Sequence, residues 1–414
     1  VQRGRSESRY GAAVALALLF LAVRVVILFV RPPFFDELYS VWMAGEPLSS
    51  IVPHLLHDSG PPLYYFLARF PSVDALRWMS LAFAAIAFAI LLKRRWYVAA
   101  ALLAVFPPAV FYATEARAYA LCGLFVAIGV LLLDNDRPLP AAIAFVLAAY
   151  THYYGVLFFP VLLVRGQGAG RRAQVFAFVL TCFLFLPGFA LALHQPPEAT
   201  AWNVFHPPWA LLGIVASIAV ARRWRFAPAV LIPVGLALAI SLAGRNIYFP
   251  TRFESVLAVP FVLWASISLE RWRPAVRYAV VVVLMIGSGL MIAEEMKRPS
   301  DSRVRAAMFA ERFGPVDVVA SDYAYLFVRA RLGPRVRPFP PEQGEHPGWY
   351  RPPSVEAALA ATRSLPANGF VFVGDAFTPE LAAVRQVRRV QLRFSDGPAV
   401  VLWVEPAGLT GTVH

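Results

Sequence analysis

Two adjacent carboxylates, Asp36 and Glu37, follow the first long apolar run of the chain after only a few residues. A carboxylate can accept a proton as a general base, and two neighbouring carboxylates raise one another's pKa toward neutrality. We therefore interpret the pair as catalytic, with Asp36 as the first choice of base and Glu37 as the second. The plain alternative is that both acids solvate a loop or cap a helix that starts near Leu38.

Further candidates stand in later polar turns and combine acids, arginines, tyrosines and histidines. Arginine binds phosphate groups with two parallel hydrogen bonds, so the arginines suit an anionic substrate. The residues that we expect to bind substrate are His57, Asp58, Tyr64, Glu115, Arg117, His152, Arg245, Tyr248 and Arg252. The structural alternatives are interfacial ion pairs, a satisfied histidine, snorkelling arginines and a belt of aromatic residues at a membrane surface.

The composition and the apolar runs indicate a membrane protein. Of 414 residues, 59% are hydrophobic and the mean hydropathy is +0.61, an excess that lipid must cover. One run contains Pro107-Pro108 and should stop or kink there. We expect an α-helical polytopic membrane protein with about eleven transmembrane helices, near 11–30, 75–92, 96–110, 118–133, 139–150, 153–164, 173–193, 209–221, 227–243, 254–269 and 276–293.

The net charge of +13 reflects topology, and we expect no nucleic-acid partner. Arginine clusters fall between alternate apolar runs, which is the positive-inside pattern and places the N-terminus in the cytoplasm. The run from Gly11 to Val30 is interpreted as an uncleaved first span. Arg24 within it is expected to snorkel outward or to pair with a site carboxylate. Cys122 and Cys182 lie in apolar segments, where two small buried residues are expected and no disulfide.

Residues 294–414 have the composition of a soluble domain, with no nucleotide fingerprint such as GxGxxG. Eleven crossings from a cytoplasmic N-terminus place this segment outside, as a small C-terminal α/β extracytoplasmic domain. The rest, 1–293, forms a transmembrane domain with a functional first outer loop, 31–74. Short β-branched runs predict strands, and helical patterns stand between them: strands Val316–Ala320, Phe370–Gly374 and Val400–Val404, helices Arg303–Phe313 and Glu380–Arg389.

The order of the polar motifs resembles that of bacterial C-superfold (GT-C) membrane glycosyltransferases related to protein O-mannosyltransferases and aminoarabinose-lipid A transferases. In that family an acidic pair precedes Asp-x-His-Pro-Pro-Leu-Tyr-Tyr, Gln-Glu-Ala-Arg-x-Tyr-Ala-Leu, Tyr-Thr-His-Tyr and a late Arg-Tyr. Motif resemblance covers about 24–165, and the topology agrees to about 293. Gly60 replaces the His before Pro-Pro, and Phe253 replaces the last Tyr. The matching segments of this chain are 36–37, 58–65, 114–121, 150–153 and 252–253.

The resemblance implies sugar transfer from a polyprenyl-phosphate donor at the outer face of the plasma membrane, without a nucleotide. In an inverting transfer a carboxylate takes the proton of the acceptor hydroxyl while the sugar C1 loses its phosphate, a role that suits Asp36. The acceptor is expected to be a lipid, a glycan or a protein. We expect no cofactor and no metal, because Gly60 removes the family's His, unless His57 substitutes for it.

Two other functions stay open. A transporter or flippase of lipid-linked substrates predicts repeated halves and polar residues near the bilayer midplane. The candidate residues here gather in outer turns instead, and no repeat is evident. A non-catalytic scaffold relative is the second alternative, supported by Gly60 and Phe253 but opposed by the intact acidic pair.

Overall fold

The computed structural model describes residues 2–58, 60–164, 170–195, 225–244, 247–297, 300–344 and 353–407. Contacts divide the chain into two compact units. The first, here the helical unit, comprises Val1–Arg31 and Ser59–Lys297. The second, here the mixed unit, comprises Pro32–Asp58 and Arg298–His414. The segment that carries Asp36 and Glu37 therefore folds with the C-terminal part of the chain.

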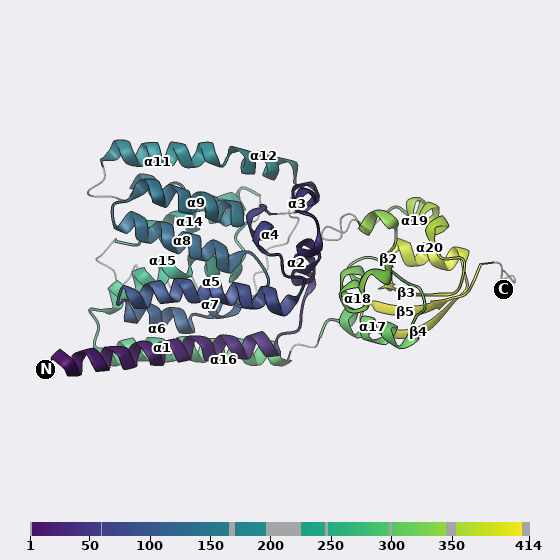
Figure 1. Ribbon diagram of the computed structural model, residues 1–414, viewed down its shortest axis with the longest axis horizontal. Helices are drawn as coiled ribbons and strands as arrows, with labels where there is room; N and C mark the ends of the chain where they lie inside the picture. The colour runs from purple at the N-terminus through teal and green to yellow at the C-terminus, as the bar shows by residue number, and fades with distance from the viewer. Residues whose placement is uncertain are drawn as a thin grey trace. The chain divides into compact units, whose positions relative to one another are not determined.

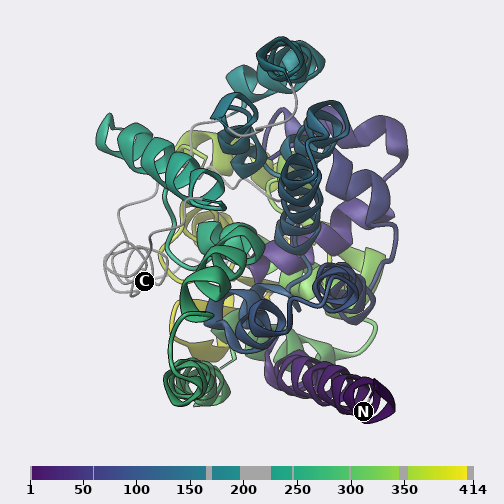
Figure 2. The same ribbon diagram turned by 90° about the vertical axis from the view of Figure 1, so that its left-hand side faces the viewer.

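The helical unit consists of helices that run side by side, as Figures 1 and 2 show from two directions. Large apolar side chains lie exposed on α1, α11 and α16, as expected for surfaces that face lipid. The helices are α1 (Gln2–Val30), α4 (Leu63–Leu67), α5 (Val73–Lys93), α6 (Tyr97–Val105), α7 (Pro107–Tyr112), α8 (Tyr119–Asp134), α9 (Pro138–Thr151), η1 (Tyr153–Phe158), α10 (Val161–Val164), α11 (Arg171–Leu184), α12 (Leu186–His194), α14 (Pro228–Leu242), α15 (Arg252–Leu269) and α16 (Pro274–Lys297).

Each predicted apolar run within the described ranges coincides with a helix or with a broken pair of helices, and the run 209–221 lies outside them. Among the described residues, four helices are long and apolar enough to cross a membrane, or five if the bent pair α11 and α12 forms one span. Several other apolar helices are shorter. The chain is a multi-pass membrane protein, and its predicted count of eleven crossings is not established.

Helices α8, α9 and α15 form the centre of the helical unit. Nearly all residues of α15 are buried. Helices α8 and α9 approach closely at Gly129, where an added Cβ would lie 2.4 Å from the Phe145 ring. Small residues at such positions allow helices in membranes to pack tightly. Cys122 is buried in this core, whereas Cys182 on α11 is exposed, so the expectation of two buried cysteines is wrong for Cys182.

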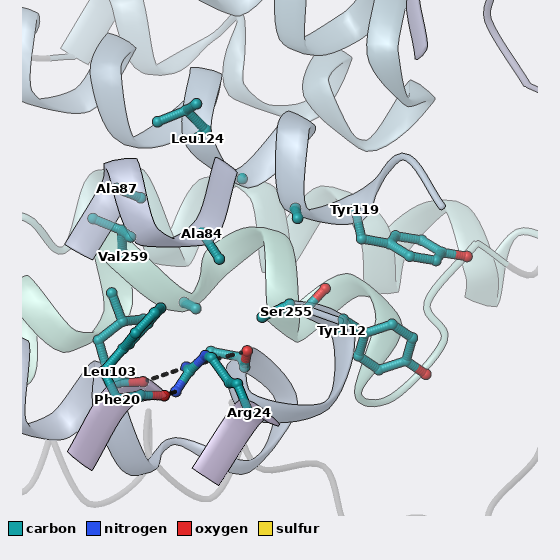
Figure 3. Close-up of a pocket in the computed structure, with 15 residues that line it drawn as sticks. Phe20, Arg24, Ala84, Ala87, Leu103, Tyr112, Tyr119, Leu124, Ser255 and Val259 are labelled. Carbon is teal, nitrogen blue, oxygen red and sulfur yellow. Dashed lines mark hydrogen bonds between the residues drawn. The ribbon is translucent and has the colours of Figure 1, made fainter. Parts of the chain in front are cut away.

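Arg24 stabilises the break between α6 and α7. The expected stop at Pro107-Pro108 is confirmed, because α6 ends at Val105 and α7 begins at Pro107. The Arg24 guanidinium is buried and donates to the backbone oxygens of Leu103, Ala104, Ala109 and Phe20 over 2.9–3.3 Å. It also lines a cavity of about 40 Å³ (Figure 3). Arg24 thus neither snorkels nor pairs with a carboxylate, and it satisfies carbonyl groups that the helix break exposes.

The mixed unit contains a five-stranded sheet with the order β2-β1-β3-β5-β4. Strand β1 pairs in parallel with β2 and β3, and β5 pairs antiparallel with β3 and β4. Helices α17 and α18 contact the sheet, and α20 packs on the β3 face that carries Phe370 and Phe372. The elements are α2 (Phe35–Gly45), α3 (Leu48–Leu55), α17 (Ser302–Ala310), η2 (Glu311–Phe313), β1 (Val318–Ala320), α18 (Ala324–Leu332), η3 (Gly333–Arg335), β2 (Val336–Pro338), η4 (Pro341–Gly344), α19 (Val355–Ala361), η5 (Thr362–Ser364), β3 (Phe370–Asp375), α20 (Pro379–Val387), β4 (Val390–Asp396) and β5 (Ala399–Val404).

Candidate functional site

The acidic pair lies in the first turn of α2, in the mixed unit. The helix begins at Phe35, and its N-cap residue Phe34 makes no side-chain capping bond. Asp36 and Glu37 are therefore helical residues, and the alternative that they cap a helix near Leu38 is wrong. Asp36 is half-buried and Glu37 is fully buried. Carboxylates in this position interact favourably with the positive end of the helix dipole.

His57 and Asp58 belong to the same unit and follow the end of α3. Their backbone N–H groups donate to the carbonyl oxygens of His54 and Leu55, 3.1 and 3.3 Å away. The His57 side chain is exposed, whereas Asp58 is only 8% exposed.

A second group of candidates gathers at one end of the helical unit, where α1 and α9 end and α8 and α15 begin. Its first element is an ion pair between Arg31 and Glu115, with Nη1 and Oε2 3.1 Å apart. Both side chains are less than a tenth exposed. The buried Arg77 donates to the Arg31 carbonyl oxygen over 2.7 Å and so satisfies the end of α1. A buried ion pair such as this one tolerates the loss of one partner poorly.

Arg117 and His152 lie beside aromatic residues in this group. Arg117 donates to the Tyr65 hydroxyl over 3.1 Å. The His152 ring packs on Tyr119 and Tyr154, with centroids 5.1 and 4.3 Å apart. Its Nδ1 accepts a hydrogen bond from the Tyr154 N–H over 3.2 Å, which fixes the ring orientation. Arg117 and Arg252 both act electrostatically on His152, so this imidazole lies in the field of two cations.

Arg252 is the first residue of α15, and a capping box holds it in place. Thr251 is the N-cap, and its N–H donates to Glu254 while its side chain accepts from the Glu254 N–H. The φ of Thr251 is +70°, an unfavourable region for a β-branched residue. Tyr112 shares a 3.1 Å hydrogen bond with the Thr251 hydroxyl, and Tyr248 donates to Glu254 over 3.0 Å. A helix N-terminus with an arginine at its first position favours an anionic group.

The structure therefore divides the predicted candidates between the two units. The helical unit brings together five of them: Glu115, Arg117, His152, Tyr248 and Arg252. Tyr64 is in the same unit, buried, with its ring 5.5 Å from that of Tyr65. The mixed unit holds Asp36, Glu37, His57 and Asp58. Arg245 lies outside the described residues.

Several partners in this group are not among the residues predicted to bind substrate: Arg31, Tyr65, Tyr112, Thr251 and Glu254. The capping box had a readable signal, since Thr251 and Glu254 have the spacing T-x-x-E directly before an apolar run. The Arg31–Glu115 pair had none, because the two residues are 84 positions apart.

Gly60 has a conformational reason to differ from the family's His. Its φ is +118°, a region that residues with a Cβ rarely adopt, although space around it is open. The Gln195 side chain holds it from both sides: the Gly60 N–H donates to Oε1 over 3.3 Å, and Nε2 donates to the Gly60 carbonyl over 2.8 Å. The Tyr153 hydroxyl donates to the same Oε1 over 2.8 Å. The second departure, Phe253, is buried between the rings of Tyr154 and Tyr248.

Within the described ranges, no group of three or more His, Cys, Asp or Glu side chains is placed to hold a metal ion. The expectation that no metal or cofactor takes part stays a prediction.

The fold is similar to that of a solved structure along nearly the whole chain. This structure is the crystal structure of ArnT from Cupriavidus metallidurans in the apo state. The TM-score is 0.56 at 15% sequence identity, and the match covers 95% of this chain and 98% of that one. No protein-family model matches the chain, and no curated protein sequence matches it.

Proposed function

We propose that this chain is a glycosyltransferase of the bacterial inner membrane, with its N-terminus in the cytoplasm. It transfers a sugar from a polyprenyl-phosphate donor to a lipid, glycan or protein acceptor at the extracytoplasmic face. The observation that carries the proposal is the ArnT-like fold across 95% of the chain, combined with arginines gathered at one end of the helical unit.

In this proposal Asp36 is the general base of an inverting transfer. It takes the proton of the acceptor hydroxyl as the oxygen attacks the sugar C1, and the polyprenyl phosphate leaves with the electron pair of the broken C1–O bond. Asp36 is half-buried, whereas Glu37 is fully buried and is assigned to support the helix. The acidic role is thus assigned to the mixed unit.

The helical unit supplies the phosphate contacts. Arg117 and Arg252 are half-buried, and both act electrostatically on His152. Guanidinium groups bind phosphate bidentately, and the N-terminus of α15 adds a positive dipole end beside Arg252. Glu115 is assigned to hold Arg31 through the buried ion pair, and Tyr248 to hold Glu254 and the capping box.

The transporter alternative receives less support. It needs ionisable groups along a path through the bilayer. Arg24, a buried cation inside α1, donates to three backbone oxygens at the helix break and to one within α1. The gathered charges lie at helix ends instead.

A transfer assay with purified protein in nanodiscs tests the proposal. Radiolabelled polyprenyl-phosphate sugars are offered as a panel with an envelope lipid extract, and wild type is compared with Asp36→Asn. We expect one donor to be consumed by wild type, and a loss of at least about 10²-fold in Asp36→Asn because the proton acceptor is gone.

Donor binding is measured in parallel, and Asp36→Asn should bind the donor like wild type. Glu46→Gln, a change of a half-buried acid at the other end of α2, is the matched control and should keep activity. If no donor is consumed and wild type and Asp36→Asn bind alike, the transferase proposal is wrong, and flux assays in liposomes then test the transporter.

A further inference from the structure

The first turn of α2 packs against the C-terminal part of the mixed unit. The Phe35 ring meets the Tyr323 ring edge to face, with centroids 4.7 Å apart. Helix α2 also contacts α18, which starts directly after Tyr323. Burial, Asp322 and Asp36 together raise the pKa of the Tyr323 hydroxyl above its usual value. The candidate base therefore lies close to a residue nearly three hundred positions later in the chain.

Tyr323 is itself held by a network of charged side chains. The Arg303 guanidinium lies 5.4 Å from the centroid of its ring. Arg303 is fixed in turn by Asp375 at the end of β3, to which Nε and Nη2 donate over 3.2 and 2.5 Å. The Tyr323 N–H donates to the Asp322 carboxylate over 2.5 Å. The Tyr323 ring contacts Arg303, and the Tyr323 backbone is held by Asp322. Both contacts stabilise the position of the ring that faces α2.

The turn that carries Tyr323 is also held in an unusual conformation. Asp322 has a φ of +58°, and the Gln343 side chain bonds both its N–H and its carbonyl oxygen, over 3.0 and 2.6 Å. Both residues are buried. Because several hydrogen bonds hold this turn, the position of Tyr323 is well defined.

Helix α2 needs such support more than a long helix would. It has 11 residues and no side-chain N-cap bond, and isolated helices shorter than about 12–15 residues are marginal in water. The direction in which its first turn points is therefore set by tertiary packing. A shift of about 1 Å in a reacting group can cost on the order of 10² in rate.

We propose that Tyr323 is a positioning residue, through which the C-terminal part of the mixed unit orients the first turn of α2 and with it the Asp36 carboxylate. This inference rests on the proposed function for the role of Asp36, and it gives the C-terminal part of the chain a share in the reaction. The observed contact with Phe35 is a contact between the two rings, so the Tyr323 ring is expected to carry the effect.

The test compares Tyr323→Ala, Tyr323→Phe and the control Phe377→Ala in the full-length protein. Phe377 belongs to the same unit but is 99% exposed. We expect Tyr323→Ala to lower kcat on the order of 10²-fold with donor binding within about two-fold of wild type. Tyr323→Phe keeps the ring and should stay within about three-fold, and Phe377→Ala should match wild type.

Hydrogen exchange of residues 35–45 separates this inference from the proposed function, because it needs no transfer activity. Exchange should speed up in Tyr323→Ala alone. Should wild type transfer no sugar while this exchange pattern holds, only the proposed function fails. Unchanged kcat and unchanged exchange in Tyr323→Ala would overturn the inference, and so would equal losses in the Ala and Phe variants.

A second variant covers the case in which Tyr323→Ala unfolds the sheet, seen as faster exchange in β3 and β5. Phe35→Ala removes the same ring contact from the α2 side. It should reproduce the loss in kcat while β3 and β5 keep their protection. If Phe35→Ala retains wild-type kcat, Tyr323 does not position Asp36.

Discussion

The two units hold their candidate residues by different means. In the helical unit, charged groups are fixed by polar contacts between segments far apart in the sequence, such as the ion pair of Arg31 with Glu115 and the hydrogen bond of Arg117 to Tyr65. In the mixed unit, the acidic pair stands on a short helix that is fixed by ring packing on Tyr323. Polar contacts orient a side chain through charge and hydrogen-bond geometry, whereas ring packing orients it through the shapes of the two surfaces. The two units should therefore respond to different substitutions.

Both units contain the same hydrogen-bonding arrangement, in which a glutamine amide bonds the N–H and the carbonyl oxygen of one residue with a positive φ. Gln195 bonds Gly60 in this way, and Gln343 bonds Asp322. The bonded residue is a glycine in one case and an aspartate in the other because the two φ values differ. Asp tolerates the left-handed region near +58°, whereas +118° strongly favours glycine.

The largest effect is expected from breaking the ion pair of the helical unit. Arg31→Gln should lower the free energy of unfolding by about 3–5 kcal/mol, because Glu115 would lose a buried cationic partner. Thermal unfolding in detergent measures the change. The matched control is Arg225→Gln, since Arg225 pairs with Asp134 at the other end of the bundle but is 52% exposed. It should cost no more than about 1 kcal/mol, and equal losses in both variants would contradict the distinction.

The next largest effect is expected on donor binding, and it tests whether Arg252 of the helical unit binds the donor phosphate. Arg252→Ala should weaken donor binding about 10- to 100-fold, because a charge-assisted contact to phosphate is lost. Arg252→Lys should recover only part of it, since lysine lacks the bidentate geometry. Binding of a labelled polyprenyl-phosphate sugar gives the measurement. Arg94→Ala is the control, because Arg94 is an exposed arginine at the C-terminal end of α5. A loss of kcat with unchanged binding would move Arg252 out of the phosphate site.

In the mixed unit, pH should matter through Glu380. This side chain is buried, neither carboxylate oxygen has a hydrogen-bond partner among the described residues, and burial raises its pKa to about 7. Its contribution to stability is complete below about pH 4.5 and is lost as the pH rises through about 7.

Exchange protection of β3 and α20 in the full-length protein should accordingly fall between pH 5 and pH 8, by on the order of 2 kcal/mol. Glu380→Gln should remove most of this fall, because an amide carries no charge at either pH. A variant with the same pH dependence as wild type would show that Glu380 is not its source.

The smallest effect tests the glycine. Gly60→Ala should destabilise the helical unit by about 1 kcal/mol, since alanine is strained at that φ although nothing lies within 4 Å of its Cβ. Gly235→Ala is the matched control. It also has open space, and it lies inside α14 with an ordinary φ, so the change should stabilise slightly. We expect Gly60→Ala to lower the unfolding temperature and Gly235→Ala to raise it slightly. Changes of the same sign in both variants would contradict the conformational explanation of Gly60.

The strands of the mixed unit show what sequence patterns can predict. The three predicted strands are confirmed as β1, β3 and β5, whose residues are almost all buried. The edge strands β2 and β4 were missed. They are short or largely exposed, so they lack the continuous apolar signal on which the prediction depends. The helices Arg303–Phe313 and Glu380–Arg389 are confirmed in α17 with η2 and in α20, with boundaries shifted by a few residues.

The sequence by itself determined the apolar helices, the break at Pro107-Pro108, the buried strands and the residue types of the candidate site. These follow from local properties: hydrophobic run length, proline geometry and the order of polar motifs. Only the tertiary structure decided which of those residues meet. Gly60 and Gln195 are 135 positions apart, and Phe35 finds Tyr323 in the C-terminal part of the chain. Contacts at such separations depend on how whole elements pack, because no local pattern encodes the partner.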